Sequence, residues 1–370
     1  MSRHDRVIRA GRVVCPRTGL DGPGAVALDG HRIVAVGPGL EGEVVQEFPD
    51  AILLPGFIDL HSHPGRVGTT VHAVSTHQNM LAHGVTTTLS QGDAGADTLA
   101  DYLDKTHEPS GTRVFMALNL SRRGEQAKGT FANPDDANID ACVAAAAAHP
   151  DFIWGIAVNI SRHSCGHTDP RLIARRGIEA AEQSGLPILF GLRCPEDWPL
   201  ADQLELLRPG DVVTYCYRRR PHCIVDWKTR RVLPEVRAAR ERGIIFDVGH
   251  GMGSFDFEVA ETAIAEGFPP DTISTDFQRR HLDTQTEHSL PLVMAKLKAA
   301  GMPEADVFRA VTTRPAEILR RESDLGTIAP GASSDLVAMV NAGDREFTDV
   351  DGTTRRGSSW KVVMTSQGNG

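Results

Sequence analysis

The feature that most constrains the fold is a long alternation of short apolar segments with segments of helical length, which begins near residue 51. Runs of strand length bounded by turn residues indicate buried strands, and strands that alternate with helices indicate a parallel sheet. The pattern therefore predicts an α/β chain folded as a (β/α)₈ TIM barrel, in which catalytic groups collect at the C-terminal ends of the strands. The expected strands are 51–60, 86–89, 114–118, 153–158, 186–190, 211–215, 244–248 and 272–276, and the clearest expected helices are 139–149, 172–183, 233–242, 257–266 and 290–300.

The two ends of the chain have a different pattern from the middle. Residues 6–48 contain short strands broken by turns, with Asp29-Gly30 as an expected hairpin turn, and short strands return after Leu325. Two β-rich ends that flank a barrel can pair with each other, so we expect a small composite β-sandwich domain formed by both termini. The predicted boundaries are 1–54 for its N-terminal part, 55–324 for the barrel and 325–370 for its C-terminal part.

Composition favours a soluble globular protein. Hydrophobic residues make up 41% of the 370 residues and charged residues 24%, and the net charge of −9 argues against nucleic acid as a partner. Neither an apolar run of about 18 residues nor an N-terminal apolar signal segment is present, which argues against a membrane association and predicts a cytoplasmic location. The six cysteines form no CxxC pair, so reduced thiols are expected rather than a disulfide framework.

A pair of histidines, His61 and His63, follows directly after the first barrel strand. Residues i and i+2 of a strand project to the same side, so the two imidazoles are expected to point together. Two imidazoles on one side of a strand end can bind a transition metal. The alternative for an isolated pair of this kind is two surface or hydrogen-bonded histidines, but the preceding Leu-Pro-Gly-Phe-Ile-Asp run favours a metal site.

The stretch Pro55-Gly-Phe-Ile-Asp-Leu-His-Ser-His63 resembles the first-strand signature of the amidohydrolase superfamily of metal-dependent hydrolases. The tail phrase around Gly326, Pro330-Gly331 and Asp335-Leu336-Val337 and the order of β, barrel and β segments are similar to that superfamily too. Residues 211–214, 246–257 and 273–276 resemble its dihydroorotase-like deacetylase branch. The resemblance implies hydrolysis of a small amide or acyl ester at a binuclear metal site. Its ligands would be the histidine pair, a carboxylated lysine on strand 4, histidines on strands 5 and 6, and an aspartate on strand 8, which is Asp276 here.

Three of those implied ligands are replaced. The lysine position on strand 4 is Ala157, the histidine position on strand 5 is Gly191, and the histidine position on strand 6 is Tyr215. An ordinary binuclear hydrolase is therefore not expected. One interpretation keeps a single divalent ion, Zn²⁺, on His61, His63 and Asp276, with an open position and an additional ligand. The candidates for that additional ligand are Cys194, Cys216, Cys223, His163 and His222.

The other interpretation is a metal site that has decayed, which leaves a small-molecule binding protein or metal-free chemistry by Tyr215, Asp276 and nearby basic residues. Retention of His61, His63 and Asp276 favours the mononuclear site. In it, we expect Asp276 to serve as a general base and Tyr215 to polarise the substrate carbonyl by donating its phenolic proton. His250, at the end of strand 7, is a further catalytic candidate, with a structural hydrogen bond as its alternative role.

Substrate-binding candidates lie after the middle strands. Asn159 and His163 follow strand 4, Arg193 follows strand 5, and Arg218 opens a basic run after strand 6 whose alternative is a solvated loop. Because guanidinium groups bind carboxylates and phosphates, these positions predict an anionic substrate. The helix-region histidines His72, His77 and His83 are expected to be surface or packing residues.

The expected function is thus hydrolysis of a small amide, cyclic amide or acyl ester by an amidohydrolase-like enzyme with a reduced metal site. Lyase or isomerase chemistry on an anionic small molecule is the enzymatic alternative, because loss of the metal pair removes the usual source of hydroxide. A catalytically silent binding protein is the non-enzymatic one. The resemblance also implies a homo-oligomer.

Overall fold

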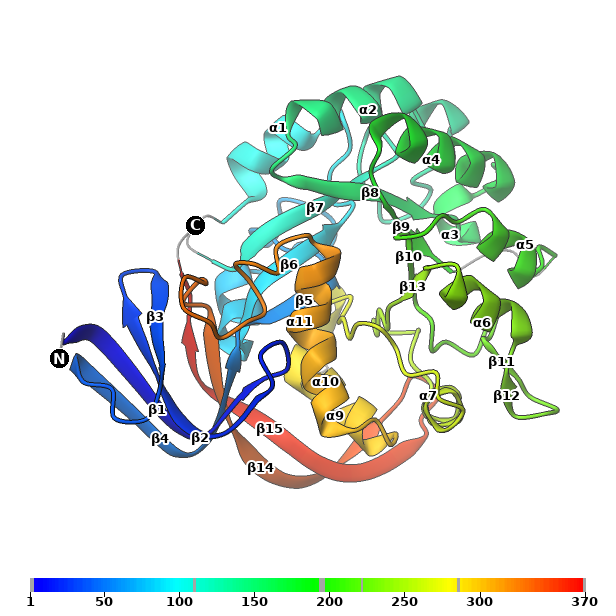
Figure 1. The fold of residues 1–370 in the computed structure, drawn as a ribbon. Coiled ribbons are helices and arrows are strands. Elements are labelled where there is room, and N and C mark those ends of the chain that lie inside the picture. Colours follow the sequence, from blue (N-terminus) through cyan, green and yellow to red (C-terminus); the bar gives the residue numbers. More distant parts are fainter. Residues whose placement is uncertain (1–2, 109–110, 193–196, 221, 285–286, 369–370) are drawn as a thin grey trace.

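The protein is described by a computed structural model that covers residues 3–108, 111–192, 197–220, 222–284 and 287–368. Its centre is a curled sheet of seven strands in the order β13-β10-β9-β8-β7-β6-β5, and all neighbours in this sheet are parallel (Figure 1). These strands are β5 (Phe57–Ser62), β6 (Val85–Gln91), β7 (Arg113–Asn119), β8 (Ile153–Asn159), β9 (Ile188–Gly191), β10 (Val212–Thr214) and β13 (Ile245–Phe246). The order confirms the predicted α/β class and parallel sheet.

Helices connect and cover the parallel strands, as the alternation of segments predicts (Figure 1). The five helices expected most clearly from the sequence are present as α2, α4, α6, α7 and α9. The helices are α1 (Leu99–Asp101), α2 (Ile139–Ala148), α3 (Arg162–Cys165), α4 (Pro170–Ser184), α5 (Leu200–Glu205), α6 (Pro234–Glu241), α7 (Phe257–Ala265), α8 (Arg279–Asp283), α9 (Leu290–Ala299), α10 (Glu304–Val311) and α11 (Thr313–Ile318), with short helical turns η1 (Thr76–Met80), η2 (Leu81–His83), η3 (Tyr102–Thr106) and η4 (Pro134–Asp136).

The eighth predicted strand, 272–276, is not a regular strand. Two isolated parallel bridges, Asp247↔Thr272 and Ser62↔Phe277, connect this segment to the two edges of the curled sheet. Between the bridges Asp276 has a φ of 49°, a left-handed conformation that interrupts an extended run. The backbone bonds from Val248 N to Thr272 O and from His63 N to Phe277 O still hold the segment against both edges. The curled sheet is therefore closed by a bent segment, and the bend occurs at a predicted metal ligand.

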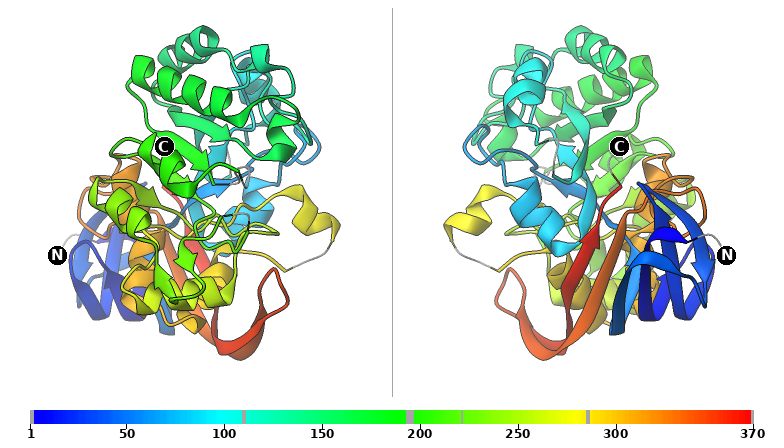
Figure 2. Two further views of the ribbon diagram at one scale, coloured as in Figure 1. Left: turned by 90° about the vertical axis from the view of Figure 1, so that its right-hand side faces the viewer. Right: turned by 90° about the vertical axis from the view of Figure 1, so that its left-hand side faces the viewer.

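The two ends of the chain share a second sheet of six strands, in the order β15-β14-β4-β1-β2-β3. In Figure 2 its N-terminal strands, in blue, lie beside the orange and red C-terminal strands. The Asp29-Gly30 turn between β2 and β3 is present as predicted. Division of the chain into a barrel and a separate sandwich domain at 54 and 325 stays a prediction. The strands are β1 (His4–Cys15), β2 (Leu20–Asp29), β3 (Arg32–Gly37), β4 (Gly42–Pro55), β14 (Leu336–Thr348) and β15 (Thr354–Ser366), and a separate small hairpin is formed by β11 (Val225–Asp226) and β12 (Arg231–Val232).

The inside of the curled sheet is a packed apolar core rather than a pore, as expected for this architecture. Most of the strands contribute one residue to it, and residues of α11 and of the segment that follows pack against the same core. Ala157 of β8 is one of these buried core residues. The members from the strands are Ile58, Leu60, Leu89, Ala117, Ala157, Leu189, Val212 and Ile245.

Among the described residues, none of the helices combines the length and apolar character needed to cross a bilayer.

Candidate metal centre and active site

His61, His63 and Asp276 come together at the C-terminal edge of the curled sheet. All three are buried, and one possible ligand atom from each lies within 4.8 Å of the others. The His63 Nε2 atom lies 3.2 Å from Asp276 Oδ1, and the His61 Nε2 atom lies 3.5 Å from the same oxygen. The histidines reach this point from the end of β5 and the aspartate from the bent closing segment. The geometry therefore joins the three residues that sequence analysis grouped.

The opposite nitrogen of His61 is held by a buried hydroxyl network. His61 Nδ1 lies 2.8 Å from Thr214 Oγ1, and Thr214 Oγ1 donates to Asp247 Oδ2 at 2.8 Å. Because the single hydroxyl proton of Thr214 is directed at Asp247, its oxygen accepts the proton of His61 Nδ1. Ser274 Oγ also donates to Asp247 Oδ2, at 2.6 Å. The network fixes the tautomer of His61 with its lone pair on Nε2, the atom that faces Asp276.

His63 is oriented in the same way by a carboxylate. His63 Nδ1 lies 2.9 Å from Asp93 Oδ1, and the other oxygen of Asp93 accepts from Ser90 Oγ at 2.6 Å. Burial lowers the pKa of His63, but the carboxylates of Asp93 and Asp276 outweigh it and raise that pKa to about 10. A carboxylate on the far nitrogen is the usual outer partner of a metal-bound histidine. Both imidazoles therefore present Nε2 to the same point.

Asp276 is held in place by backbone conformation and by a glycine. Its left-handed φ of 49° is uncommon for a residue other than glycine. A Cβ atom added at Gly251 would overlap Asp276 Oδ2, so only glycine leaves room for the carboxylate there. Burial alone would raise the pKa of Asp276, but His61 and His63 hold it well below its usual range. The carboxylate is thus ionised and fixed beside the two histidines.

The three replaced ligand positions carry no side chain that sequence analysis expected as a ligand of a second metal. Ala157 lies in the apolar core, and Gly191 ends β9 without a side chain. Tyr215 follows β10, and its hydroxyl lies 3.3 Å from His61 Nε2. A Cβ atom at Gly191 would stand 3.2 Å from Tyr215 Cε2, so the tyrosine ring occupies space next to the missing strand-5 side chain.

Other predicted site residues are mostly placed elsewhere. His250 is buried but packed into the protein: its Nδ1 lies 2.7 Å from Gly251 O, its Nε2 lies 3.0 Å from Lys296 Nζ, and its ring stacks on Phe255. These contacts correspond to its alternative structural role, because both ring nitrogens are already occupied by protein groups. Burial lowers the pKa of His250 well below its usual value, so the ring is neutral.

The predicted substrate-binding residues do not assemble into one group. Asn159 ends β8 and accepts a hydrogen bond from Ser161 N at 3.2 Å, while exposed His163 in α3 bonds Ala127 O. Arg218 is half-buried after Tyr217, and Arg193 lies outside the described residues. The described positions thus lie at the end of β8, in α3 and after β10. Sequence spacing could not predict their arrangement, because it does not fix where long side chains in loops point.

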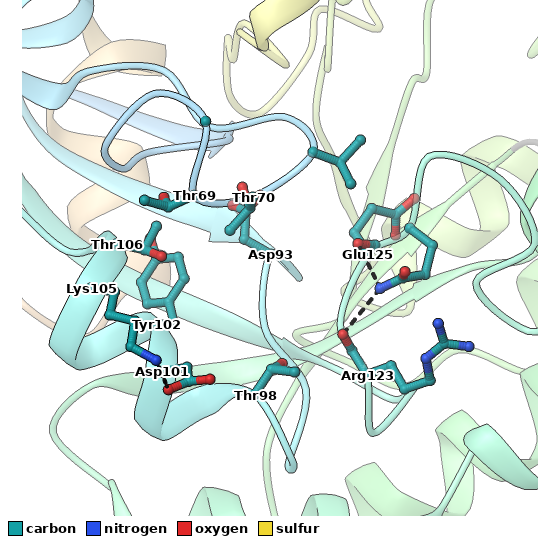
Figure 3. A pocket seen from close by; sticks show the side chains of 13 residues that line it. Thr69, Thr70, Asp93, Thr98, Asp101, Tyr102, Lys105, Thr106, Arg123 and Glu125 are labelled. Carbon is teal, nitrogen blue, oxygen red and sulfur yellow. Dashed lines mark hydrogen bonds and ion pairs between the residues drawn. The ribbon is translucent and has the colours of Figure 1, made fainter.

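A pocket of about 590 Å³ is lined in part by Asp93, the carboxylate that contacts His63 (Figure 3). Its walls come from the loops after β5, β6 and β7 and from η3, all at the C-terminal edge of the sheet. Asp93, the partner of His63, forms part of the wall, and Glu125 forms another part. Asn119 Nδ2 donates to Glu125 Oε2 at 3.2 Å, and burial raises the pKa of Glu125 to about 7. Asp93 therefore separates a pocket large enough for a small substrate from the predicted metal ligand His63.

Comparison with known proteins decides the family. No protein-family model matches the sequence. A deacetylase of Agrobacterium fabrum is 32% identical over 340 residues, which are 88% of this chain and 80% of that protein. A deacetylase of Enterococcus faecalis is 28% identical over 369 residues, 95% of this chain and 94% of that protein. The crystal structure of an adenine deaminase superposes with a TM-score of 0.88 at 26% identity and covers 99% of this chain and 98% of the other. This chain belongs to the amidohydrolase superfamily.

The residues of this amidohydrolase-superfamily chain fit one metal ion. Two imidazoles with outward-fixed Nδ1 atoms and one ionised carboxylate form a donor set suited to a zinc-like divalent ion. Cys216, Cys223, His163 and His222, considered as additional ligands, do not join the cluster in the part of the chain that the structure describes, and Cys194 lies outside that part. Burial raises the pKa of Cys216 well above its usual value, so this thiol is protonated and inert.

Two residues at this superfamily site, Asp93 and Glu125, were not predicted from the sequence. Asp93 follows β6 just as the histidine pair follows β5, and its position after a strand end was an available signal. Glu125 lies in the loop after β7 and carries no comparable local pattern. His72 was expected at a surface or packing position, and the structure buries it with its ring 4.9 Å from that of His63. Its place beside the metal ligands depends on the path of the 64–75 loop, which no spacing rule predicts.

Proposed function

We propose that this chain is a metal-dependent hydrolase of a small amide, cyclic amide or acyl ester that works with one divalent ion, Zn²⁺. The observation that carries the proposal is the buried cluster in which His61 Nε2, His63 Nε2 and Asp276 meet. The relatives named deacetylases support the reaction class, since they match nearly the full length of this chain.

His61, His63 and Asp276 would hold the ion, which when bound supplies Lewis acidity and an activated water. Thr214 and Asp93 keep the two imidazoles in the binding tautomer and orientation. The second carboxylate oxygen of Asp276, Oδ2, lies against Gly251, and we assign Asp276 the role of general base that takes the proton from the attacking water. The pocket lined by Asp93 and Glu125 would hold the substrate.

An anionic substrate remains part of the proposal. It rests on the basic residues Arg193 and Arg218 after strands 5 and 6, which bind carboxylates or phosphates well. Replacement of Arg193 by Ala is expected to raise KM for carboxylate-bearing substrates and to leave KM for neutral analogues unchanged. An unchanged KM for the carboxylate series would remove this part of the proposal.

The function is tested by incubating the zinc-loaded protein with a panel of N-acetyl amines, cyclic amides and acyl esters. Hydrolysis is expected for at least one class, with loss of activity in His63→Asn and retention in the control His77→Gln, which changes an exposed histidine of η1. Turnover in ¹⁸O-labelled water separates the alternative, because hydrolysis places solvent oxygen in the product acid. Turnover without that label would favour a lyase or isomerase reaction. That alternative is included because Ala157 and Gly191 replace two ligands implied by the family resemblance.

A further inference from the structure

Tyr215 stands at the chain position where the superfamily resemblance implies a histidine ligand, and it is built into the metal cluster. It directly follows β10, is buried, and has a left-handed φ of 67°. Its ring centre lies 5.1 Å from that of His61. Among the described residues four non-glycine residues have a positive φ, and two of them, Tyr215 and Asp276, lie beside His61.

Three donor-atom distances at this point are those expected between neighbouring ligands of one metal ion. Tyr215 Oη lies 3.3 Å from His61 Nε2, His61 Nε2 lies 3.5 Å from Asp276 Oδ1, and His63 Nε2 lies 3.2 Å from the same oxygen. Neighbouring ligand atoms around a tetrahedral zinc with bonds of about 2.0–2.2 Å stand about 3.3–3.6 Å apart. The tyrosine oxygen is thus as close to a metal-facing nitrogen as the carboxylate oxygen is.

Two glycines make room for the tyrosine ring. A Cβ atom at Gly191 would stand 3.2 Å from Tyr215 Cε2, and a Cβ atom at Gly249 would stand 3.0 Å from Tyr215 Cδ1. A histidine at position 191 would therefore compete with the Tyr215 ring for the same space. Glycine at position 191 and tyrosine at position 215 therefore fit together, because the glycine leaves the space that the tyrosine ring fills.

We propose that Tyr215 is the fourth protein ligand of the ion held by His61, His63 and Asp276, bound through its phenolate oxygen, and that the water of the proposed function takes a fifth position on the ion. The proposal rests on the metal site of the proposed function. Binding breaks the phenolic O–H bond and forms an oxygen–metal bond, and the proton leaves to solvent. A phenolate has no proton to donate, so this role replaces the carbonyl-polarising role that the sequence suggested. The additional ligand is then neither a cysteine nor a loop histidine.

The test is a zinc titration of chelator-stripped protein, followed by the ultraviolet difference band of tyrosinate. The chain has three tyrosines, so the signal can be assigned by substitution. One tyrosinate per bound zinc is expected in the wild type and in the control Tyr217→Phe, whose buried hydroxyl donates to Phe268 O at 3.0 Å instead. The band should vanish in Tyr215→Phe, and zinc affinity measured against a competing chelator should fall at least about 10-fold.

Zinc binding by the wild type without a tyrosinate band would overturn the ligand role of Tyr215 and leave the proposed function standing. Equal zinc affinity of Tyr215→Phe and wild type would do the same. Failure of the wild type to bind zinc at all would overturn both proposals. Because the band is measured on the wild type, the result does not depend on whether the Phe variant folds.

Discussion

At the scale of single residues, the site depends on backbone conformations that few side chains tolerate. Tyr215 and Asp276 both have positive φ, and Gly249 and Gly251 lie against them without a Cβ atom. Strain of this kind costs about 1–3 kcal/mol per residue and persists only where surrounding contacts enforce it. Backbone hydrogen bonds at both positions supply such contacts here: Asp276 N donates to His61 O at 2.7 Å, and Cys216 N, directly after Tyr215, donates to Asp247 O at 3.2 Å.

Substitution of Gly251 by Ala should displace Asp276. The added Cβ would overlap the carboxylate, and the φ of 47° at this position disfavours alanine in addition. We expect zinc affinity to fall at least about 10-fold, with a comparable loss of kcat/KM. Gly253→Ala is the matched control, because nothing lies within 4 Å of a Cβ there. Zinc content and activity of Gly251→Ala equal to those of Gly253→Ala would contradict this account of Asp276.

Glu125 should make the protein less stable as the pH rises. The folded-state pKa of its carboxyl is about 7, above the usual value near 4.5, so between these two pH values the folded state binds more protons than the unfolded state. The free energy of unfolding therefore falls as the pH rises through this window. Glu125→Gln removes the effect. We expect the free energy of unfolding of Glu125→Gln to rise by about 1–2 kcal/mol relative to that of the wild type between pH 4.5 and pH 8. This difference is smaller than the full linkage value because the side chain has partial solvent contact.

Urea unfolding of the metal-free wild type and Glu125→Gln at a series of pH values measures this difference. Glu304→Gln serves as a control with the opposite sign, because Lys298 and Arg12 outweigh burial and lower the pKa of Glu304. A stability difference between wild type and Glu125→Gln that is constant from pH 4.5 to pH 8 would be inconsistent with a raised pKa at this position.

At the scale of elements, the two sheets are joined by a partly buried ion pair. Arg113 at the start of β7 donates to Asp335 Oδ2 at 2.7 Å, and Asp335 Oδ1 accepts from Gly368 N at 2.7 Å. Arg113 also donates to Gly368 O at 2.8 Å. These bonds connect the parallel sheet to the C-terminal segment that completes the six-stranded sheet.

Replacement of Arg113 by Met should leave the buried Asp335 carboxylate without its cation. We expect the free energy of unfolding to fall by about 2 kcal/mol, since loss of one partner of a partly buried pair exposes the desolvation cost of the other. Arg122→Met removes an exposed pair with Asp97 and should change it by less than about 1 kcal/mol. Chemical denaturation of both variants gives the comparison, and equal effects would show that Arg113 does not join the sheets.

The elements show how far sequence patterns reach. Segments α2, α4, α6, α7 and α9 and seven parallel strands lie where periodicity and turn residues predicted them. The prediction of a regular eighth strand was wrong, because the left-handed bend at Asp276 serves the site and leaves no trace in an apolar pattern. The parallel pairing of β1 with β4, and the hairpin of β11 and β12, depend on contacts between distant segments and were not predicted.

At the scale of the whole molecule, the residues at strand ends could be placed from the sequence. Residues whose positions depend on loop conformation could not. His61, His63 and Asp276 meet as expected because the ends of neighbouring strands share one edge of the sheet. Arg218, His163 and His250 could not be placed from spacing, since contacts such as that of His250 with Lys296 on α9 depend on packing between distant elements. The change at Tyr215 was visible in the sequence, but its distance from His61 required the fold.

We propose that His61, His63 and Asp276 hold a single metal ion. Elemental analysis of the purified protein, with His61→Ala beside it and His77→Gln as the control, measures this most directly. We expect about one equivalent of divalent metal per chain in the wild type and in His77→Gln, and near zero in His61→Ala. Two equivalents per chain, or a wild type that remains metal-free in excess zinc, would contradict it.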